Sequence, residues 1–489
     1  MSQPDNLLTA WRNGLIDCDM RLSQARLAQC HGVRVPTYER QQITPGILHL
    51  GVGAFHRAHQ AVYADDLLAG GDMRWGIVGV SLRSDRAQRQ LQPQDHLYTV
   101  ATKSTEQTDY RVIGSVLEVL VLAQQRAQLM AYFADPRIQV VTLTITEKGY
   151  CLGSDGGINW SHPDVQHDLA HPESARGAPG LLVAGLRARR AAGAGPLTVI
   201  SCDNLQANGQ ATQRVVAEMF AAVDPEGLRW MQDHVSFPGT MVDRIVPATR
   251  AGDLTRLADR QGYEDAGLVT AEPFTQWVIE SDFAGIQPDW QSVGAQWVDT
   301  VAPYESAKLR LLNASHSALA YWGLHRGYTF IHQAMADPEL LARTINFMAD
   351  EVIPNLALPT EFDVSAYQAA IVDRFRNNAV PYPARQVAAD GSLKLAQRVF
   401  PTLQNNQETG RASPWALDVV AAWLAALLDP LIEFDDPARD QLPVDLNPEM
   451  SSADLVNRLV HSTTLCGPVA KNTSSMQALI TRLGAYRGL

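Results

Sequence analysis

The feature that most constrains the fold is a regular alternation, in the first half of the chain, of short apolar runs and segments with helical spacing. The apolar runs lie at residues 46–55, 75–82, 137–150 and 196–204, and a helical segment follows at 206–222. This alternation predicts an α/β domain with a mostly parallel sheet, because parallel strands need a crossover connection between them. The segment 108–123 fits either a strand or a helix.

The pattern changes after about residue 300, where helical periodicity continues and β-branched runs become rare. Ser413 precedes Pro414 and Trp415, so the sequence predicts a helix that begins at Pro414 with Ser413 as its N-cap. We therefore expect two domains, an α/β domain over 1–295 and a mainly helical domain over 296–489. The boundary is expected between about residues 290 and 300.

The overall charge excludes one large class of partner. The 489 residues include 40 Lys and Arg against 52 Asp and Glu, a formal net charge of −12, and contain no basic run. Nucleic acid is therefore not expected as a partner, although a local cationic pocket for a small acidic substrate is compatible with this charge.

The cysteines and apolar segments indicate the compartment. Five cysteines are scattered without a CxxC spacing, which fits neither a disulfide framework nor a zinc ribbon and suits the reducing cytoplasm. Residues 1–22 carry charges throughout and lack the apolar core of a secretory signal. The most apolar window, 415–428, contains Asp418 and is shorter than the ~20 residues of a membrane span. We expect a cytoplasmic protein without a membrane partner.

A glycine turn follows the first apolar run directly. Gly51 and Gly53 would let the backbone turn tightly and approach a pyrophosphate at the start of the next helix. Position 56, where a dinucleotide fingerprint has its third glycine, is His, and the best candidate for the ribose-binding acid is Asp85. An ordinary tight strand–helix turn explains the same two glycines.

His56 and His59 stand three residues apart, on one helical face if the segment is helical. A metal site needs at least one further ligand at a suitable spacing, and the sequence has no HExxH or comparable cluster. We therefore predict no catalytic metal and place both histidines on a helix surface or at the edge of a cofactor.

Polar residues follow two of the predicted strands. Glu147 and Lys148 end one of them, and Asp203 and Asn204 end another. Ligands of doubly wound sheets bind beyond the carboxyl ends of the strands, which favours a functional role, although loop capping explains the same residues. Asp243, in the irregular stretch 236–247, either faces the same crevice or pairs structurally with Arg244.

The stretch 308–316, KLRLLNASH, combines three groups suited to proton transfer on one predicted helix. At about 100° per residue, His316 lies about 80° and Asn313 about 140° from Lys308, so one broad face would carry all three. A desolvated lysine can act as a general base, and an amide can donate to a developing alkoxide. A solvated polar face of an amphipathic helix is the alternative.

Six stretches keep a common order over about residues 46–330: GVGAFHRAHQ, TLTITEKGY, ISCDN, FPGTMVDRIVP, EPFTQWVIESDFAG and KLRLLNASHSALAY. Together they resemble the mannitol dehydrogenase family, the polyol-specific long-chain dehydrogenases, which includes mannitol 2-dehydrogenase and fructuronate reductase (D-mannonate oxidoreductase). In the C-terminal third, AADGSLKLAQR is the clearest matching piece. The resemblance implies an NAD(P)-binding Rossmann-type domain, a helical domain for substrate and catalysis, and metal-independent hydride transfer.

The resemblance also implies roles for single residues of both domains. The catalytic base is matched by Lys308, the substrate-orienting histidine by His316, and the amides that hold the reacting oxygen by Asn204 and Asn313. Substrate positions are matched by Asp243 and Lys394, and an acid near the proton exit by Glu305. Cofactor positions are matched by Gly51, Gly53, Phe55 and Asp85. A carboxylate at Asp85 favours NAD over NADP because it repels the 2′-phosphate, although Arg83 and Arg86 lie beside it.

The prediction of the substrate depends on a few residues within and near these stretches. TEKGY, TMVDRIVP and Gln386 are nearer the fructuronate-reductase form than the mannitol form, and Lys148 could face a substrate carboxylate, where a surface lysine is the alternative. Ala314 stands where both branches commonly have glycine. We expect an NAD-dependent oxidoreductase for D-mannonate and D-fructuronate, as a monomer or small homo-oligomer. The alternatives are an enzyme for mannitol, arabinitol or sorbitol, and a dinucleotide-binding regulator without turnover.

Overall fold

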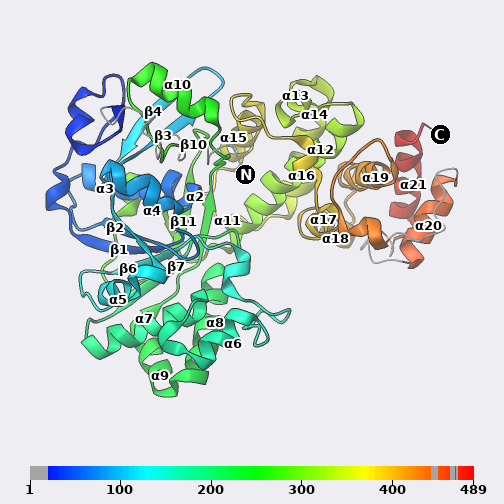
Figure 1. Cartoon of the computed structure of the whole chain (residues 1–489). Coiled ribbons are helices and arrows are strands. Elements are labelled where there is room, and N and C mark those ends of the chain that lie inside the picture. The colour runs from blue at the N-terminus through cyan, green and yellow to red at the C-terminus, as the bar shows by residue number, and fades with distance from the viewer. Residues whose placement is uncertain (1–19, 442–449, 463–468, 470–471, 489) are drawn as a thin grey trace. The chain divides into compact units, whose positions relative to one another are not determined.

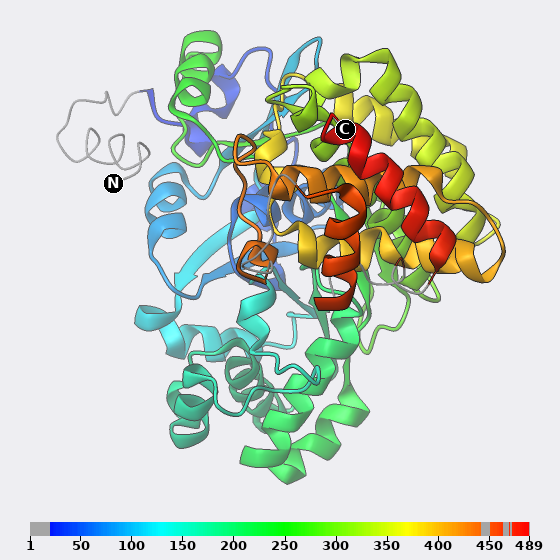
Figure 2. The same cartoon turned by 90° about the vertical axis from the view of Figure 1, so that its right-hand side faces the viewer.

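The computed structural model describes residues 20–441, 450–462, 469 and 472–488. The chain divides into two compact units, one that ends at Val301 and one that begins at Ala302 (Figures 1 and 2). Most of the N-terminal stretch that we distinguished from a secretory signal lies outside the described residues.

The described part of the first unit is built on a six-stranded sheet with the order β5-β2-β1-β6-β7-β8, and every neighbouring pair in it is parallel. The strands are β1 Pro45–Leu50, β2 Gly76–Ser81, β5 Val116–Val121, β6 Val140–Leu143, β7 Leu197–Ser201 and β8 Val235–Ser236. The predicted α/β class is confirmed. Since β6 lies between β1 and β7, the carboxyl ends of these three strands meet at one edge.

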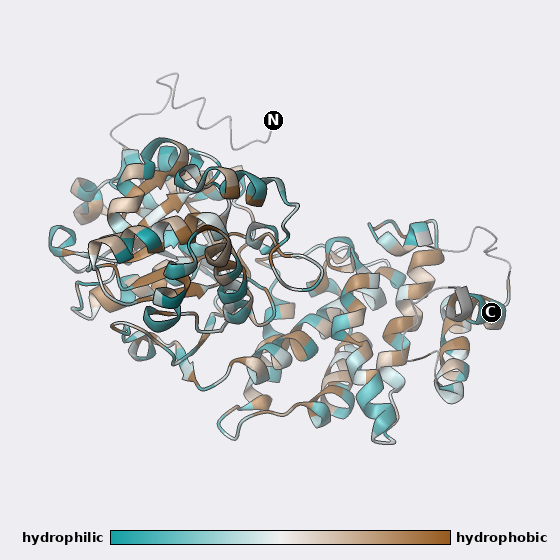
Figure 3. Cartoon of the chain, turned by 90° about the horizontal axis from the view of Figure 1, so that it is seen from below, coloured by the Kyte–Doolittle hydropathy of each residue, from teal (hydrophilic) through white to brown (hydrophobic). Residues whose placement is uncertain are grey.

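Helices cover both faces of this sheet, as Figure 1 shows. One face packs against α3 (Gln60–Ala69) and α4 (Arg86–Leu91). The other packs against α5 (Leu122–Phe133), α7 (Ala178–Ala192) and α8 (Asn208–Val223). The central strands are therefore buried on both sides, which explains why they appear in the sequence as continuous apolar runs rather than alternating ones. Figure 3 shows these hydrophobic positions on the strands.

Several sequence expectations are sharpened by the structure. The ambiguous segment 108–123 forms β4 (Thr108–Ile113) and β5, and α5 begins directly after β5. Strand β6 ends at Leu143, earlier than predicted, because the chain then turns into a short 3₁₀ segment at Glu147–Tyr150. The helix predicted at 206–222 is α8.

Two smaller sheets and further helices complete the first unit. The sheets have the orders β10-β3-β4 and β12-β11-β9. Their other strands are β3 Tyr98–Lys103, β9 Thr240–Asp243, β10 Val269–Ala271, β11 Gln276–Glu280 and β12 Gln296–Val298. The remaining helices are α2 Ala54–Ala58, α6 Pro163–Ala170, α9 Pro225–His234 and α10 Ala251–Gln261.

The described part of the second unit is helical, as the sequence predicts. Its helices up to residue 376 are α11 Ala302–Ala307, α12 Ala314–His325, α13 Ile331–Ala336, α14 Pro338–Asn346 and α15 Val364–Arg376. They are followed by α16 Ala384–Ala388, α17 Gly391–Arg398, α18 Phe400–Glu408, α19 Pro414–Leu428, α20 Ser452–Ser462 and α21 Thr473–Tyr486. Helix α19 is buried along most of its length, which explains the apolar window at 415–428. No described helix has the length and hydropathy to cross a membrane.

Helix α19 begins at Pro414 with Ser413 at the N-cap position, as predicted, but the serine side chain does not cap the helix. The Ser413 hydroxyl accepts a hydrogen bond from Asn406 Nδ2 (3.0 Å) and makes no capping bond. Instead the buried carboxylate of Glu351 accepts the N–H groups of Trp415 (2.6 Å) and Ala416 (2.8 Å). A carboxyl group from a distant segment thus takes the place of the serine side chain, and burial raises the pKa of Glu351 to about 7.

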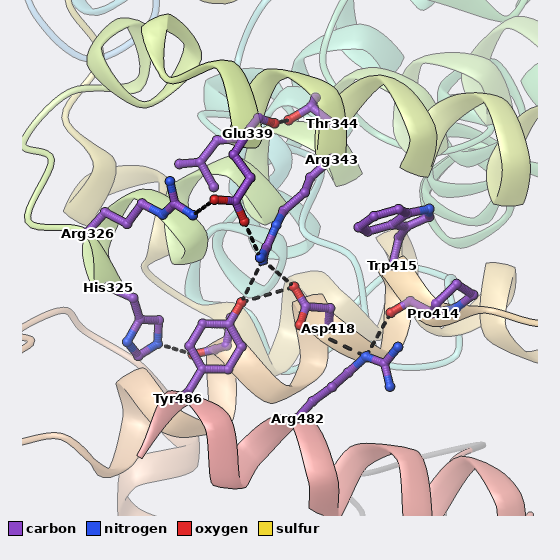
Figure 4. A network of polar contacts seen from close by, with 12 residues as sticks. His325, Arg326, Glu339, Arg343, Thr344, Pro414, Trp415, Asp418, Arg482 and Tyr486 are labelled. Atoms are coloured by element: carbon purple, nitrogen blue, oxygen red, sulfur yellow. Dashed lines mark hydrogen bonds and ion pairs between the residues drawn. The ribbon is translucent and has the colours of Figure 1, made fainter. Parts of the chain in front are cut away.

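The single acid within the apolar helix α19, Asp418, joins three helices (Figure 4). Its Oδ2 accepts from Arg343 Nη1 of α14 at 3.0 Å and from the Tyr486 hydroxyl of α21 at 3.0 Å. Arg343 is also paired with Glu339 one turn earlier on α14 (2.6 Å). Burial and the neighbouring Asp418 carboxylate raise the pKa of Tyr486, so the hydroxyl stays a donor to that carboxylate. The network holds α21 against α14 and α19.

We predict that Asp418→Asn lowers the free energy of unfolding by about 1–3 kcal/mol, because Arg343 and Tyr486 lose a charged acceptor in a largely buried place. Urea unfolding of the variant measures this loss. The exposed acid Glu408 of the same unit provides the control, since Glu408→Gln should change stability by less than about 0.5 kcal/mol. Equal stability of the two variants would contradict the role assigned to Asp418.

Candidate functional site

The glycine turn lies at the carboxyl end of β1, between the strand and α2. Gly51 has φ +102°, and a Cβ on it would stand 2.2 Å from the carbonyl oxygen of Thr144, so no other residue fits there. A Cβ on Gly53 would meet only the Gly51 oxygen, at 3.8 Å. The turn is thus closely packed behind Gly51 and open in front of Gly53, the arrangement that an approaching phosphate group requires.

A buried histidine on β1 holds the carbonyl group of this turn. His49 Nε2 lies 3.0 Å from the Gly51 oxygen, and the Thr144 hydroxyl donates to the same oxygen at 2.7 Å. On the other side of the ring, Nδ1 lies 2.8 Å from the Thr142 hydroxyl. A carbonyl can only accept, so Nε2 carries the proton and Nδ1 accepts from Thr142. With the Gly53 N–H, which donates to the same oxygen at 2.7 Å, three donors fix the Gly51 peptide.

His56 and His59 are buried, so their predicted place on a helix surface is wrong, and a place at the edge of a cofactor stays a prediction. His49 and His56 are both fully buried and stack with ring centroids 3.3 Å apart. His59, where the helical path breaks between α2 and α3, is also buried, and its Nε2 lies 2.9 Å from the Gln276 carbonyl oxygen. The helical-face estimate failed because the chain kinks at His59. The described residues contain no group of three or more potential metal ligands.

The other two candidate cofactor residues flank the turn. Phe55, on α2, is half-buried and stacks on the His59 ring at 5.0 Å. Asp85 follows β2 and precedes α4, and its carboxylate pairs with Arg89 one helical turn later at 3.1 Å. Because β2 is the neighbour of β1, Asp85 lies after a strand end beside the glycine turn. This is the place at which a Rossmann-type sheet carries its ribose-binding acid.

Two more candidates follow the strands on the other side of β1. Lys148 lies in the exposed 3₁₀ turn after β6, and Asn204 is exposed three residues after β7 ends. Parallel pairing of β1, β6 and β7 therefore brings Gly51, Lys148 and Asn204 to one edge of the sheet. Asp243 is the last residue of β9 in a separate small sheet, is buried, and stands opposite Gln276.

In the second unit, the segment Lys308–Asn313 is a π-helix between α11 and α12. The backbone N–H of Ala314 bonds to the Leu309 oxygen, five residues earlier. In this winding, residues five apart are about one turn apart. Asn313 therefore lies on the same side as Lys308, and the angle of about 140° expected for an α-helix was wrong. π-Turns of this kind are frequent at functional sites.

The His316 ring is held by two aromatic neighbours of the same unit. It stacks on Phe375 of α15 with centroids 5.0 Å apart and meets the edge of Tyr382 at 5.3 Å. Behind the π-turn, the buried Arg310 guanidinium donates to the Thr402 hydroxyl at 3.1 Å. The polar side of the segment is thus supported from α15, and its inner side from α18.

Helix α17 packs against the π-turn and α12 and carries Lys394. The Lys394 ammonium donates to the Ala389 carbonyl at 2.6 Å, and burial lowers its pKa. One turn later, Arg398 donates to the Asn313 carbonyl (3.3 Å) and to the Ser317 hydroxyl (2.9 Å). Arg398 therefore ties the helix of Lys394 to the residue pair Asn313 and Ser317. Glu305 is half-buried on α11, three residues before Lys308.

The candidate residues thus form two groups, each described within its own unit. The first unit carries Gly51, Gly53, Phe55, Asp85, Lys148, Asn204 and Asp243. The second unit carries Glu305, Lys308, Asn313, His316 and Lys394. Sequence reasoning missed His49 and Arg398, which support these groups. A histidine within the apolar run GILHL was the available signal for His49, whereas nothing local distinguishes Arg398.

Comparisons with known proteins cover both units. The family model described as the mannitol dehydrogenase Rossmann domain matches residues 45–292, and the mannitol dehydrogenase C-terminal domain matches residues 300–486. The chain belongs to the mannitol dehydrogenase family. It is accordingly an oxidoreductase of the class that acts on CH–OH groups, as the sequence resemblance implied.

Relatives within the mannitol dehydrogenase family include enzymes for two kinds of substrate. D-mannonate oxidoreductase of Escherichia coli is 39% identical over 394 residues, which cover 80% of this chain and 81% of that protein. Mannitol 2-dehydrogenase of Cereibacter sphaeroides is 38% identical and covers 79% and 82%. Pseudomonas fluorescens mannitol 2-dehydrogenase, solved as a ternary complex with NAD and D-mannitol, is 39% identical, covers 96% of this chain and 97% of that one, and has a TM-score of 0.80.

We predict a specific pH dependence of stability from His49. Burial lowers the pKa of His49 to about 3, so between pH ~6.5 and ~3 only the unfolded chain protonates this ring and stability falls as the pH falls. His49→Gln should destabilise the protein at pH 7.5, and this deficit should shrink by about 2 kcal/mol at pH 5. Denaturant unfolding at both values measures it.

Thr142→Val serves as the control, because it removes the hydrogen bond to His49 Nδ1 and leaves the buried histidine in place. Its deficit should stay constant between pH 7.5 and 5. A constant deficit for His49→Gln as well would show that protonation of this ring does not contribute.

Proposed function

We propose that this chain catalyses the reversible NAD-dependent interconversion of the secondary alcohol of a sugar acid and its ketone, with D-mannonate and D-fructuronate as the first choice. The proposed catalysis rests on one observation, the π-turn Lys308–Asn313, whose winding brings Lys308 and Asn313 to the same side of the helix. A general base and an amide donor on one side of a turn are what removal of a hydroxyl proton and stabilisation of the resulting oxygen require. Family membership supports the same reaction class.

NAD fits the glycine turn of the first unit. The space in front of Gly53, which even a Cβ would enter without contact closer than 3.8 Å, leaves room for a pyrophosphate. Gly51, Gly53 and Phe55 would hold the nucleotide at the end of β1, and the Asp85 carboxylate would bind the ribose hydroxyls and disfavour NADP. The Pseudomonas fluorescens relative of 39% identity was solved as a complex with NAD and D-mannitol, which supports this cofactor. When bound, the nicotinamide supplies the hydride acceptor or donor.

The remaining chemistry belongs to residues of the chain. Neutral Lys308 takes the hydroxyl proton during oxidation, and its ammonium form returns that proton during reduction. Asn204 and Asn313 donate hydrogen bonds to the alkoxide-like oxygen. The His316 ring, held by Phe375 and Tyr382, fixes the direction of that oxygen. Glu305, three residues before Lys308, is the acid through which the proton leaves, while Asp243 and Lys394 contact the substrate.

Lys148 supports a sugar acid over a neutral polyol. Its exposed ammonium follows β6 at the same sheet edge as Asn204, so an amide for the reacting oxygen and a cation for a carboxylate are available together. The second candidate is mannitol and fructose, because the relatives with that specificity are as similar to this chain as the mannonate enzyme is.

Loss of NADH absorbance with D-fructuronate and, separately, with D-fructose distinguishes the two candidates. We expect turnover with fructuronate and at most a trace with fructose. Turnover with fructose alone would replace the proposed substrate and keep the mechanism. Turnover with neither substrate would remove the proposed function.

Lys308→Ala should abolish turnover and leave NADH binding intact, because it removes the proton acceptor and none of the cofactor residues. The measurements are kcat/KM and the NADH dissociation constant from fluorescence titration. A variant that keeps more than about a tenth of kcat/KM, a loss of under ~1.4 kcal/mol, would exclude Lys308 as the general base.

Lys148→Met should raise KM for fructuronate by at least about tenfold, because a charge-assisted contact to a carboxylate contributes about 1.5–3 kcal/mol. The matched measurement is KM for NADH, which should stay within about twofold. An unchanged KM for fructuronate would show that Lys148 is a surface lysine.

A further inference from the structure

The backbone of Thr146, directly before the turn of Glu147 and Lys148, is in a strained conformation. Its φ is +64° and its ψ is 159°, a region that is essentially restricted to glycine and is strained for a β-branched residue. Such a conformation persists only where the surroundings impose it. The hydrogen bonds around Thr146 identify the group that holds it in this conformation.

The group is the carboxylate of Asp203, which comes from the end of the neighbouring strand β7. Its Oδ1 accepts the backbone N–H of Thr146 at 2.9 Å, and its Oδ2 accepts the N–H of Ile145 at 2.9 Å. The Tyr150 hydroxyl donates to the same Oδ2 at 2.7 Å and also contacts the Ser201 hydroxyl at 2.5 Å. Asp203 therefore forms hydrogen bonds to both ends of the segment from Ile145 to Tyr150.

The Asp203 carboxylate is half-buried, with Thr146 on its exposed side and Tyr150 on its inner side. Tyr150 and Ser201 are fully buried, and burial raises the pKa of Asp203 against the opposing effect of the three donors. A carboxylate in such surroundings binds backbone N–H groups more strongly than a neutral acceptor would. The interaction is therefore strong enough to offset the cost of the Thr146 conformation.

The same loop is also tied on its other side to the glycine turn. Thr144 is held there by two hydrogen bonds. Its hydroxyl donates to the Gly51 oxygen at 2.7 Å, and its backbone N–H donates to the Leu50 oxygen at 2.9 Å. The chain from 144 to 150 is thus held between the end of β1 and the end of β7. Lys148 is within it, and Asn204 directly follows Asp203.

We propose that Asp203 is a positioning residue, which holds Thr146 in its strained conformation and thereby fixes the Lys148 turn relative to Asn204. This inference rests on the proposed function for its kinetic consequence. If Lys148 binds the substrate carboxylate and Asn204 the reacting oxygen, their separation must match the length of one sugar acid. A displacement of about 1 Å between such groups can cost 100-fold in rate.

A double-mutant cycle of Asp203→Asn and Thr146→Gly tests whether Asp203 holds Thr146 in this conformation, an interaction that we call the clamp. Asp203→Asn keeps the volume and removes one acceptor, so kcat/KM for the sugar substrate should fall at least about tenfold while the NADH dissociation constant stays within about twofold. Glycine adopts the conformation of Thr146 without strain, so Asp203→Asn in the Thr146→Gly background should cost less than about threefold. Equal losses in both backgrounds would overturn the proposal.

Hydrogen exchange of the peptide covering residues 144–152 provides a readout without turnover. Asp203→Asn should speed exchange at Ile145 and Thr146, and the increase should be smaller in the Thr146→Gly background. If the wild type turns over neither fructuronate nor fructose, the proposed function fails, and exchange alone decides the clamp. Unchanged exchange in Asp203→Asn would overturn the clamp whatever the activity.

Asp168→Asn is the matched control within the first unit. Asp168 is also a buried carboxylate that accepts two consecutive backbone N–H groups, those of Arg176 at 2.8 Å and Gly177 at 2.9 Å. It should lower the melting temperature and leave kcat/KM within about twofold. An equal fall of kcat/KM in Asp168→Asn would show that the effect of Asp203→Asn is general destabilisation, and would overturn the positioning role.

Discussion

The parallel pairing of β1, β6 and β7 is the constraint on which the chemistry of the first unit depends. Because these strands are neighbours and run the same way, the glycine turn, the Lys148 turn and Asn204 must emerge at one edge. Close packing then removes the remaining freedom, since the Gly51 backbone lies directly on the Thr144 carbonyl. Small side chains and hydrogen bonds between strand ends therefore place groups that are 56 to 153 residues apart in the chain.

In the second unit, polar groups have to be placed on a helical bundle whose centre is apolar. Its central helix α19 is buried nearly throughout, so functional groups must come from helices at the periphery. The π-turn at Lys308–Asn313 widens one turn of the chain, and the carbonyl of its last residue, Asn313, accepts a hydrogen bond from Arg398 of α17. Two helices that are separate in sequence are thereby joined beside the groups proposed for catalysis.

Much of the fold was predictable from the sequence, because buried parallel strands have continuous β-branched runs and the helices between them have helical spacing. The family was predictable as well, since several ordered stretches carry it. The details that shape the site were not. The helical-wheel estimate for Asn313 assumed α-helical winding. The histidine in GILHL is unusual for an apolar strand, but the sequence does not say which groups it contacts, and Thr146 shows no sign of its backbone conformation. Each depends on contacts with distant segments, which local patterns do not record.

The cap of α19 has a consequence for how the helical unit can be divided. Its first free N–H groups are satisfied by Glu351, which lies in the π-helical segment Phe347–Val352 and is separated from the helix by α15, α16, α17 and α18. A fragment that begins after this segment would contain the whole of α19 and lack the carboxyl group that caps it. A truncation that keeps α19 capped therefore has to keep the segment of Glu351 as well.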